Sequence, residues 1–559
     1  MTAPLGRDGA TRAFAWMVIL LGLFAVVYGI QRVPLIDPDE GRNAEVAREM
    51  REAGDWITPR FHGMPYLDKP ALYFDAVGLS CAIFGGGEAA CRLPSVLFAL
   101  GTAAATFLLG AGLFGRARAL LGIAVLATAP LFVGFARVVI FDMALTFFVT
   151  TSILLAEEGR KGRPWGFPLA WVATALAVLT KGPIGLLLPV LGTTALSLGQ
   201  EPPRRLRRYF HPLHIALFFA VALPWVVEVE IRNPGFLRYA LFVETFERLT
   251  RPSFQRTGSV FYYVPVLLLG LFPWSLPALG GIATSRLRSI RRLARPSPEL
   301  GLILAAGIIV LFFSLSTSKL GGYVLPAFPL VALLIGNESV RAKDRPGSWV
   351  WTPGVALLLI GTLLLRGSVR SAIADGLHQP LALRAAVEML LIRIGAWSLA
   401  IGVLIAGLGL FRRNAAVFAL LGMWLPGVVL LGLGPAMLYA EENSSRALSS
   451  ELRRLAGDEA RVAALHCFPI GVDYYMGRVV PVVSETGQEL TSNYIARNFE
   501  ELRVNGTQGL WSPLELESRL ARGEIDILIT RGNIEPGFGL RPAGRVGGYR
   551  LWRESSPGK

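Results

Sequence analysis

Residues 93–114 decide the class of fold, and they read LPSVLFALGTAAATFLLGAGLF. These 22 residues carry no charge, and two arginines, Arg116 and Arg118, follow them. About 20 apolar residues in a helix cross the hydrocarbon core of a bilayer, and basic residues mark the cytoplasmic end. The stretch therefore predicts a membrane-spanning helix that ends on the cytoplasmic side.

The composition extends this prediction to the whole chain. Of its 559 residues, 53% are apolar and 17% are charged, with a net charge of +15. Soluble proteins are roughly a quarter charged. These figures exclude a disordered chain and a disulfide scaffold, and they argue against a soluble nucleic-acid binder, whose excess charge would lie in basic patches on a polar domain. We therefore expect a polytopic α-helical membrane protein.

Fourteen apolar segments are candidate spans: 13–30, 71–86, 93–114, 119–136, 139–156, 166–180, 184–199, 211–228, 259–281, 299–316, 322–337, 349–366, 389–411 and 415–436. Fourteen spans cannot place every basic cluster on the cytoplasmic side, as the positive-inside rule requires. Leaving out 71–86, which contains Asp75, places all of them there. We interpret 71–86 as a helix at the outer interface. The sequence then predicts about 13 transmembrane helices, with the N-terminus inside.

The basic clusters behind this topology are Arg116/Arg118, Arg160/Lys161/Arg163, Arg204/Arg205/Arg207/Arg208, Arg286/Arg288/Arg291/Arg292/Arg295, Arg341/Lys343/Arg345 and Arg412/Arg413, with Arg7 and Arg12 at the N-terminus. They account for most of the net charge. The expected organisation is a transmembrane catalytic domain over residues 1–436, with long outer loops at 31–92 and 229–258. Residues 437–559 follow outside as a soluble domain.

The predicted outer domain changes character after about residue 440. Its apolar runs shorten to strand length at 462–465, 479–483 and 525–529, with helical patterns between them. Ser512 and Glu515 form a capping-box pattern with Pro513 at the first helical position. Alternating strands and helices predict a small α/β domain.

The first long outer loop carries the sequence IDPDEGRN at residues 36–43. Asp37 is placed to cap a helix, with Pro38 at its first position and Glu40 at its third. Gly54 is placed to end it. The pattern predicts a helix that begins at the loop's acidic motif.

Two carboxylates are the candidate catalytic groups. Asp39 would lie in the first turn of that helix, where the helix dipole favours an ionised carboxylate, with Arg42 on the same face. Asp142 begins an apolar span at the outer interface, where a carboxylate is costly unless it is paired or functional. The alternatives are a well-capped surface helix at Asp39 and an aspartate that caps its own helix at Asp142.

Four bases stand in outer loops, against the orientation rule. They suggest an anionic ligand at the outer interface, and a phosphate suits a lysine acting as a point charge. The alternative is that each base reaches lipid phosphates. These bases are Lys69 (next to Asp68), Arg137, Lys181 and Lys319.

Cysteine and histidine usage gives no case for a cofactor. Five histidines show no zinc-ligand spacing, so we expect no metal or cofactor, with a divalent ion left open. Asp37-x-Asp39 has the form of a DxD motif, but no Gly-rich phosphate loop accompanies it. A Cys81–Cys91 bridge would need an oxidising compartment; two packed thiols are the commoner arrangement.

Together these residues resemble a family. The chain is similar to GT-C membrane glycosyltransferases of the protein O-mannosyltransferase-like group, and within it to the bacterial 4-amino-4-deoxy-L-arabinose (L-Ara4N) transferases that modify lipid A. The resemblance covers most of the membrane region in family order, and related transferases share nearly all of it. Asp68 stands where the family commonly has Glu. The matching motifs are Asp37-Pro38-Asp39-Glu40-x-Arg42, Glu49-Met50, Gly54-Asp55-Trp56, Leu67-Asp68-Lys69-Pro70, Ala90-x-Arg92-Leu93-Pro94-Ser95, Asp142, Leu179-Thr180-Lys181-Gly182, Tyr262-Tyr263-x-Pro265 and Ser318-Lys319-Leu320-x-x-Tyr323-x-Leu325-Pro326.

The resemblance implies a function in the bacterial inner membrane. The donor would be undecaprenyl phosphate-L-Ara4N and the acceptor a lipid A phosphate on the periplasmic face, a modification of the polymyxin-resistance type. Asp39 and Asp142 match the family's essential carboxylates. Arg42, Lys69, Lys319 and Tyr323 would line the donor-phosphate pocket.

Two other functions are compatible with the same residues. A related enzyme would apply this lipid-linked sugar chemistry to a protein hydroxyl or another glycolipid, and Asp39 would then act as a general base. A transporter of lipid-linked sugars would bind the same anionic lipid without chemistry. The paired carboxylates and the missing inverted repeats argue against transport.

Overall fold

The computed structural model describes residues 7–200, 206–247, 257–277, 295–341, 348–376, 381–410, 414–504, 509–532 and 534–554. The chain divides into two compact units. The first comprises residues 1–30, 95–224 and 245–435, and the second comprises 31–94, 225–244 and 436–559. Several predicted basic residues lie outside the described ranges: Arg204, Arg205, Arg286, Arg288, Arg291, Arg292, Lys343, Arg345, Arg412 and Arg413. So does part of the predicted loop 229–258.

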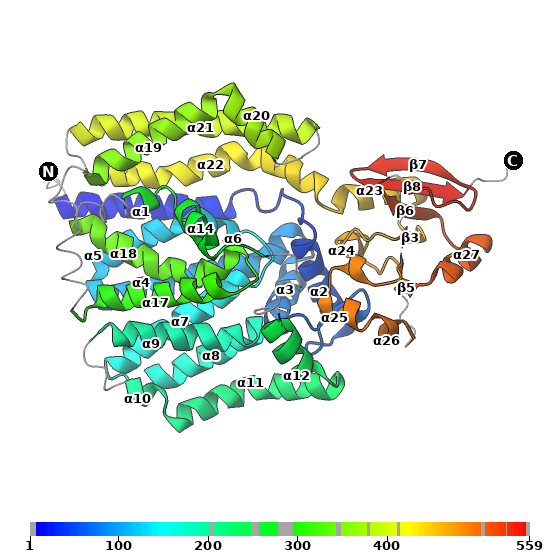
Figure 1. The fold of residues 1–559 in the computed structure, drawn as a ribbon, viewed down its shortest axis with the longest axis horizontal. Helices are drawn as coiled ribbons and strands as arrows, with labels where there is room; N and C mark the ends of the chain where they lie inside the picture. Colours follow the sequence, from blue (N-terminus) through cyan, green and yellow to red (C-terminus); the bar gives the residue numbers. More distant parts are fainter. Residues whose placement is uncertain are drawn as a thin grey trace. The chain divides into compact units, whose positions relative to one another are not determined.

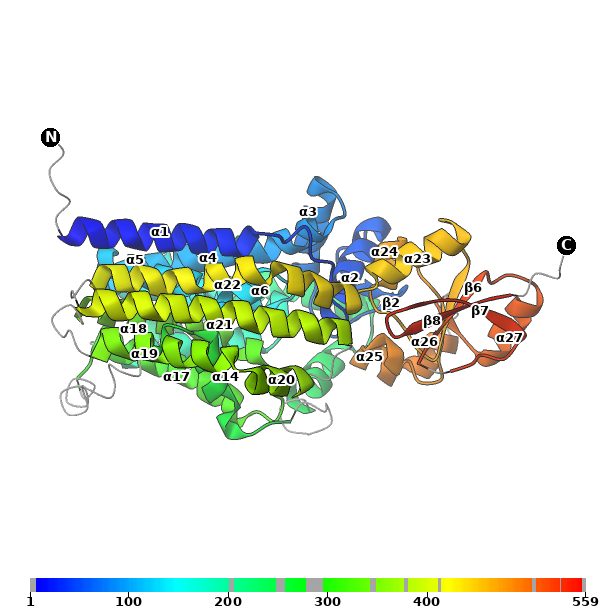
Figure 2. The ribbon, with the colours of Figure 1, turned by 90° about the horizontal axis from the view of Figure 1, so that it is seen from above.

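The first unit is built from long apolar helices that pack side by side. Figures 1 and 2 both show α19 beside α21, and the pairs α7/α8, α9/α17 and α5/α18 are also in contact. Helices dominate because each satisfies its own backbone hydrogen bonds where no water is available. Its helices, some extending into the second unit, are α1 (Arg7–Val27), α4 (Glu88–Phe114), α5 (Arg116–Ala127), α6 (Pro130–Ala136), α7 (Asp142–Arg160), α8 (Gly166–Lys181), α9 (Ile184–Leu198), α10 (Leu206–Tyr209), α11 (Pro212–Arg232), η4 (Val260–Tyr262), α14 (Tyr263–Gly270), α17 (Pro298–Leu315), η5 (Gly321–Ala327), α18 (Phe328–Arg341), α19 (Ser348–Leu365), α20 (Gly367–Gly376), α21 (Leu381–Leu410) and α22 (Asn414–Glu442).

Small residues set how closely these helices approach. A Cβ on Gly336 of α18 would lie 2.3 Å from the backbone nitrogen of Gly122 in α5. Only glycine fits at such a crossing, as is common where helices pack inside membranes. A separate aromatic core forms around Trp171, which stacks on Tyr209 with ring centroids 5.2 Å apart.

The chain is a multi-pass helical membrane protein, as predicted. Within the described residues, six helices are long and apolar enough to span a membrane, and eight spans result if two bent pairs each count as one. The segment predicted as one span at 119–136 is broken, because α5 and α6 meet at 68°. Residues 71–86, predicted to lie at the interface, contain α3 (Leu72–Phe84), which is shorter than a full span.

The second unit carries a mixed sheet of six strands in the order β5-β4-β3-β6-β8-β7. The first four strands run parallel, whereas β7 and β8 form an antiparallel edge that Figure 1 shows in red. A buried cluster that includes Leu465, Leu516 and Trp552 forms its core. The strands are β3 (Val462–Leu465), β4 (Val482–Val483), β5 (Leu510–Trp511), β6 (Ile527–Arg531), β7 (Leu540–Val546) and β8 (Tyr549–Glu554), beside the hairpin β1 (Arg60–Phe61) and β2 (Met64–Pro65). The helices are α2 (Asp39–Ala53), α3, α12 (Phe236–Arg238), η2 (Tyr239–Glu247, which ends in the first unit), α23 (Arg446–Ala456), α24 (Val472–Met476), η7 (Gln488–Leu490), α25 (Asn493–Arg497), α26 (Phe499–Val504) and α27 (Pro513–Ala521).

The local signals in the tail are confirmed. Ser512 and Glu515 form the predicted capping box at the start of α27. The predicted strands at 462–465, 479–483 and 525–529 appear as β3, β4 and β6, with β4 reduced to two residues.

The predicted start of α2 is wrong. The helix begins at Asp39, and no side chain caps it. The Asp37 carboxylate accepts a hydrogen bond of 2.6 Å at Oδ2 from the Ser445 hydroxyl and makes no capping bond to α2. Glu40 instead accepts from the backbone nitrogen of Ile36 at 3.1 Å. The predicted end is correct, since Gly54 adopts φ 64° directly after Ala53.

Candidate functional site

In the second unit, Asp39 and Arg42 form the predicted pair. Their side chains meet at 2.6 Å across one helical turn of α2. The Asp39 side chain is 49% exposed, whereas that of Arg42 is 11% exposed. Arg42 also donates to Thr491, at 2.8 Å to its hydroxyl and 3.1 Å to its carbonyl oxygen, and its guanidinium lies 5.7 Å from the centre of the Tyr66 ring. An accessible carboxylate therefore stands beside a cation held from two sides.

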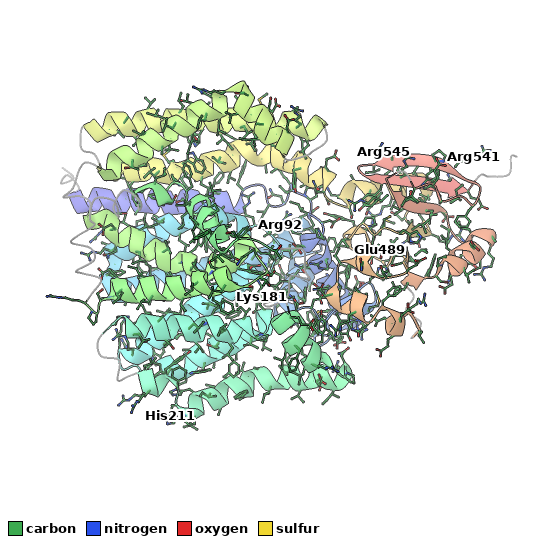
Figure 3. The ribbon with its side chains drawn as sticks, in the orientation of Figure 1. Arg92, Lys181, His211, Glu489, Arg541 and Arg545 are labelled. Atoms are coloured by element: carbon green, nitrogen blue, oxygen red, sulfur yellow. The ribbon has the colours of Figure 1, made fainter. Side chains whose placement is uncertain are left out.

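A buried ion pair holds the start of α2 in place. Arg92 of α4, labelled in Figure 3, is 2% exposed and contacts both carboxylate oxygens of Glu40 at 2.7–2.8 Å. It also donates to the carbonyl oxygens of Val33 and Pro34. Such a pair is costly to break, because the remaining charge would be buried alone. Arg92 thus orients the turn that presents Asp39.

Asp68 is a structural anchor in this structure. Its carboxylate accepts hydrogen bonds from the hydroxyls of Tyr239 and Ser492, the latter at 2.9 Å. It also accepts from the backbone nitrogens of Asn493 at 3.1 Å and Tyr494 at 3.0 Å. The carboxylate therefore ties the segment between α2 and α3 to the C-terminal part of the same unit. Its sequence-predicted contact with the donor remains a prediction.

Lys69 is held by a carboxylate that the sequence did not single out. Its ammonium donates to the carbonyl oxygen of Asp68 at 2.6 Å and pairs with Glu244 of η2. Both side chains are mostly buried, at 17% and 11% exposed. No local pattern pairs residues 175 positions apart, so only Glu244's position within the outer loop 229–258 hinted at a role. The predicted phosphate ligand already carries an anionic partner.

In the first unit, Asp142 and Lys181 form a second pair. Lys181, at the end of α8 in Figure 3, reaches Asp142 Oδ1 at 2.7 Å. The lysine Nζ also lies 5.1 Å from the centre of the Tyr323 ring. Gly322 leaves room for the carboxylate, since a Cβ there would lie 2.9 Å from Oδ1. Asp142 is the first residue of α7, with no side-chain capping bond at the preceding Phe141, so the capping alternative does not describe it.

Two predicted phosphate ligands contact helix ends in this structure, and their contact with a phosphate stays a prediction. Lys319 donates to the carbonyl oxygens of Phe313, Ser314 and Ser316, and is 5% exposed. Arg137 donates to the carbonyl oxygens of Ala25 and Tyr28 at the end of α1. Cations bind well to the carbonyls that a helix leaves unpaired. The structure groups Lys181 and Tyr323 with Asp142, but not these two bases.

One group in the described part of the chain has the spacing of a metal site. Ligand oxygens of Glu45, Glu49 and Asp473 lie within 4.8 Å of one another. Two of the three carboxylates already have basic partners, because Glu45 pairs with Arg48 at 2.6 Å and Asp473 meets His62 at 2.7 Å. Burial raises the pKa of Glu49, with repulsion from Asp473 adding to it. The group is a compensated charge cluster and does not include Asp39.

Comparisons with known proteins bear on this arrangement. Residues 16–240 match the family described as dolichyl-phosphate-mannose-protein mannosyltransferase. The undecaprenyl phosphate-alpha-4-amino-4-deoxy-L-arabinose arabinosyl transferase of Pseudomonas aeruginosa (strain LESB58) is 31% identical over 432 residues, covering 76% of this chain and 75% of that protein. The protein of the same name from Edwardsiella ictaluri (strain 93-146) is 30% identical over 350 residues, covering 61% of this chain and 62% of that protein.

A solved structure shares the fold over nearly the full length. The crystal structure of ArnT from Cupriavidus metallidurans bound to undecaprenyl phosphate superposes with a TM-score of 0.83. It is 23% identical in sequence and covers 98% of each chain. The predicted GT-C-type membrane fold is thereby confirmed in outline. The chain belongs to the glycosyltransferase family of undecaprenyl phosphate-alpha-4-amino-4-deoxy-L-arabinose arabinosyl transferases.

Proposed function

We propose that this protein transfers L-Ara4N from undecaprenyl phosphate-L-Ara4N to a phosphate of lipid A. The single observation that carries the proposal is that each predicted carboxylate lies beside a base: Asp39 beside Arg42, and Asp142 beside Lys181. The names of its relatives support the donor, and the motif set supports the acceptor class.

The donor phosphate binds to bases that carboxylates hold in the structure. Lys69 is the main candidate, because its ammonium is already bound to an anion, Glu244. A phosphate offers more charge and more acceptor oxygens than the carboxylate, so it competes for the same ammonium. Arg42, anchored on Thr491, adds a planar donor set for a second phosphate oxygen.

The reaction exchanges one phosphate for another at the sugar's anomeric carbon. An oxygen of the lipid A phosphate forms the new bond to that carbon, while the bond to the polyprenyl phosphate oxygen breaks with its electron pair. A phosphate is already ionised at neutral pH, so the acceptor needs no general base. Lys69 and Arg42 stabilise the departing polyprenyl phosphate.

The carboxylates then act on the sugar. Asp39, the accessible member of its pair, binds the sugar's ammonium or orients the ring. The opposite charges of Asp142 and Lys181 cancel, and this ion pair orients the remaining groups of the sugar. Single displacement with inversion follows by analogy with glycosidases, where paired carboxylates serve an oxocarbenium-like transition state. No resident metal or cofactor enters this scheme, so chelation should leave the rate unchanged.

The topology places this chemistry outside the cytoplasm. The arrangement predicted from the sequence, about 13 spans with the N-terminus inside, would put the basic clusters in the cytoplasm and residues 437–559 in the periplasm. This makes the protein an inner-membrane enzyme whose acceptor is reached from the periplasmic face.

Mass spectrometry of lipid A tests the proposal. A host that makes undecaprenyl phosphate-L-Ara4N but has lost its own transferase is complemented with this chain. Expected is a lipid A species carrying one or more aminopentoses, which is absent when Asp39→Asn or Asp142→Asn is expressed at equal level. If lipid A stays unmodified when the wild-type chain is expressed, the proposal that lipid A is the acceptor is wrong. Transfer by the purified enzyme from the donor to a hydroxyl acceptor would then identify it as a related enzyme with another substrate.

A further inference from the structure

Two cysteines are in contact between the end of α3 and the start of α4. Cys81 lies near the end of α3 and Cys91 in the first turns of α4, and their sulfur atoms are 3.3 Å apart. The same two helices are joined next to this contact by the Ser80 hydroxyl, which donates to the Ala90 carbonyl oxygen at 2.6 Å. The two sulfurs are thus held in contact where the end of α3 meets the start of α4.

The two thiols differ in access. Cys81 is 8% exposed and lines a cavity of about 270 Å³, whereas Cys91 is 0% exposed and its sulfur lies 3.0 Å from the Tyr474 hydroxyl. The walls of the cavity include Arg48, Arg51, Cys81, Glu88, Tyr474 and Tyr475. A small molecule in the cavity would meet Cys81 and not Cys91.

This cavity is separate from the site around Asp39. Arg48 and Arg51 lie nine and twelve residues after Asp39, which at about 100° per residue turns them about 180° and about 120° away from it around α2. Arg48 is neutralised by Glu45 and Glu52, while Arg51 has only a long contact of 3.5 Å with Glu52. Arg51 therefore brings positive charge to the cavity that faces Cys81.

The surroundings make Cys81 the more nucleophilic thiol. The hydrogen bond with Cys91 lowers the pKa of Cys81; burial opposes this, and Arg51 lowers it further. A thiolate is the reactive form in exchange with disulfides. Cys467 provides a contrast, because burial raises its pKa to about 12.

We propose that Cys81 and Cys91 are a thiol–disulfide exchange pair, in which Cys81 attacks a small disulfide that enters the cavity and Cys91 resolves the product. The Cys81 thiolate forms a bond to one sulfur of the disulfide, and the other sulfur leaves as a thiolate. Cys91 loses its proton and attacks the Cys81 sulfur, expelling the second thiolate. Two protein thiols are oxidised to one disulfide, and the small disulfide is reduced to two thiols.

A Cys81–Cys91 disulfide would affect the carboxylate site through the neighbouring Arg92. Cys91 directly precedes Arg92, which holds Glu40 next to Asp39. A disulfide would fix α3 to α4 at this point. The proposal does not depend on the sugar or acceptor, so its failure leaves the proposed function untouched.

Glutathione disulfide and full-length protein in detergent test the pair. Wild type should form a Cys81–Cys91 disulfide while Cys467 remains alkylatable, as read by peptide mass spectrometry. In Cys91→Ser, Cys81 should accumulate a glutathione adduct about tenfold faster than Cys91 does in Cys81→Ser, as expected for an accessible thiolate. Equal or reversed rates, or a wild type that keeps both thiols free, overturn the proposal.

A second measurement covers variants that fail to fold. On native wild type, a small alkylating reagent should modify Cys81 before Cys91 and Cys467, and all three should react alike in denaturant. Cys91 or Cys467 reacting first would contradict the assignment of Cys81.

Discussion

Lys181 and Asp142 form a buried ion pair, 2.7 Å from Nζ to Oδ1, with side chains 13% and 7% exposed. Three elements supply the cluster: the start of α7, the end of the next helix α8, and η5, which carries Tyr323. An ion pair at this depth is compensated only while both partners remain.

Lys181→Met should therefore destabilise the protein. Removing the lysine leaves Asp142 unpaired, which costs about 3 kcal/mol, and Asp142→Asn in the same chain should recover part of it. The apparent melting temperature in detergent measures both. The matched control is Lys161→Met, which breaks a more exposed pair with Glu158 in the same unit and should have little effect. Equal losses in the two lysine variants would contradict the buried-pair assignment.

Asp39→Asn should abolish transfer without loss of donor binding. The side chain is 49% exposed, so the change removes a charge without opening a cavity. Transfer is measured as aminopentose added to lipid A, and binding as retention of undecaprenyl phosphate. Glu52→Gln, at the other end of α2 with a side chain 51% exposed, is the control and should remain active. Asp39→Asn with normal transfer would remove Asp39 from the chemistry.

Lys69→Met and Glu244→Gln should change donor binding in opposite directions. The first removes the phosphate's proposed ligand and should weaken binding of undecaprenyl phosphate about tenfold, since a bond to a charged group is worth about 1.5–3 kcal/mol. The second removes the carboxylate that competes for Lys69 and should tighten it. Binding titrations measure both.

The control for these two variants is Arg232→Gln. This exposed base near the end of α11 pairs with Glu228 and Asp55. It should leave binding unchanged. If Glu244→Gln weakens binding as much as Lys69→Met does, then Glu244 positions the lysine and does not compete with the phosphate.

Asp37 should make stability depend on pH. Burial raises its pKa from 3.8 to about 6, so the folded chain holds a proton that the unfolded chain releases between those values. Stability from this group is present below pH 3.8 and is lost as the pH rises toward 6, by about 3 kcal/mol in the limit. Asp37→Asn does not titrate, so its melting temperature relative to wild type should rise from pH 4 to pH 7.

The comparison variant for this pH dependence is Asp458→Asn. The Asp458 side chain is 86% exposed and meets Arg453 at 3.3 Å. The difference in melting temperature between Asp458→Asn and wild type should be the same at both pH values. If the difference in melting temperature between Asp37→Asn and wild type is also the same at both pH values, then Asp37 is not buried in its neutral form.

The sequence alone determined the features that depend on neighbours along the chain. Long apolar segments predict a multi-pass helical protein, because lipid admits helices whose backbone bonds are internal. The spacing of Asp39 and Arg42 places them on one helical face, and the capping box at Ser512 needs only four residues. The end of α2 at Gly54 is equally local.

Tertiary structure decided the partners of each charged group. Asp37 was predicted to cap α2, but Ser445 takes its carboxylate. Lys69 meets Glu244, and Arg42 meets Thr491, across separations that no periodicity spans. A carboxylate binds whichever donor the folded chain brings within reach.

The outer bases show the same limit. Charge and hydropathy predict that these bases lie in outer loops, but they do not predict which acceptors the side chains contact. Lys181 turns to Asp142, while Lys319 turns to the carbonyls that α17 leaves unpaired. The ammonium group of a long lysine side chain donates hydrogen bonds to the nearest acceptors. Whether those acceptors are carbonyl oxygens at a helix end or a carboxylate is determined only by the packing of the folded chain.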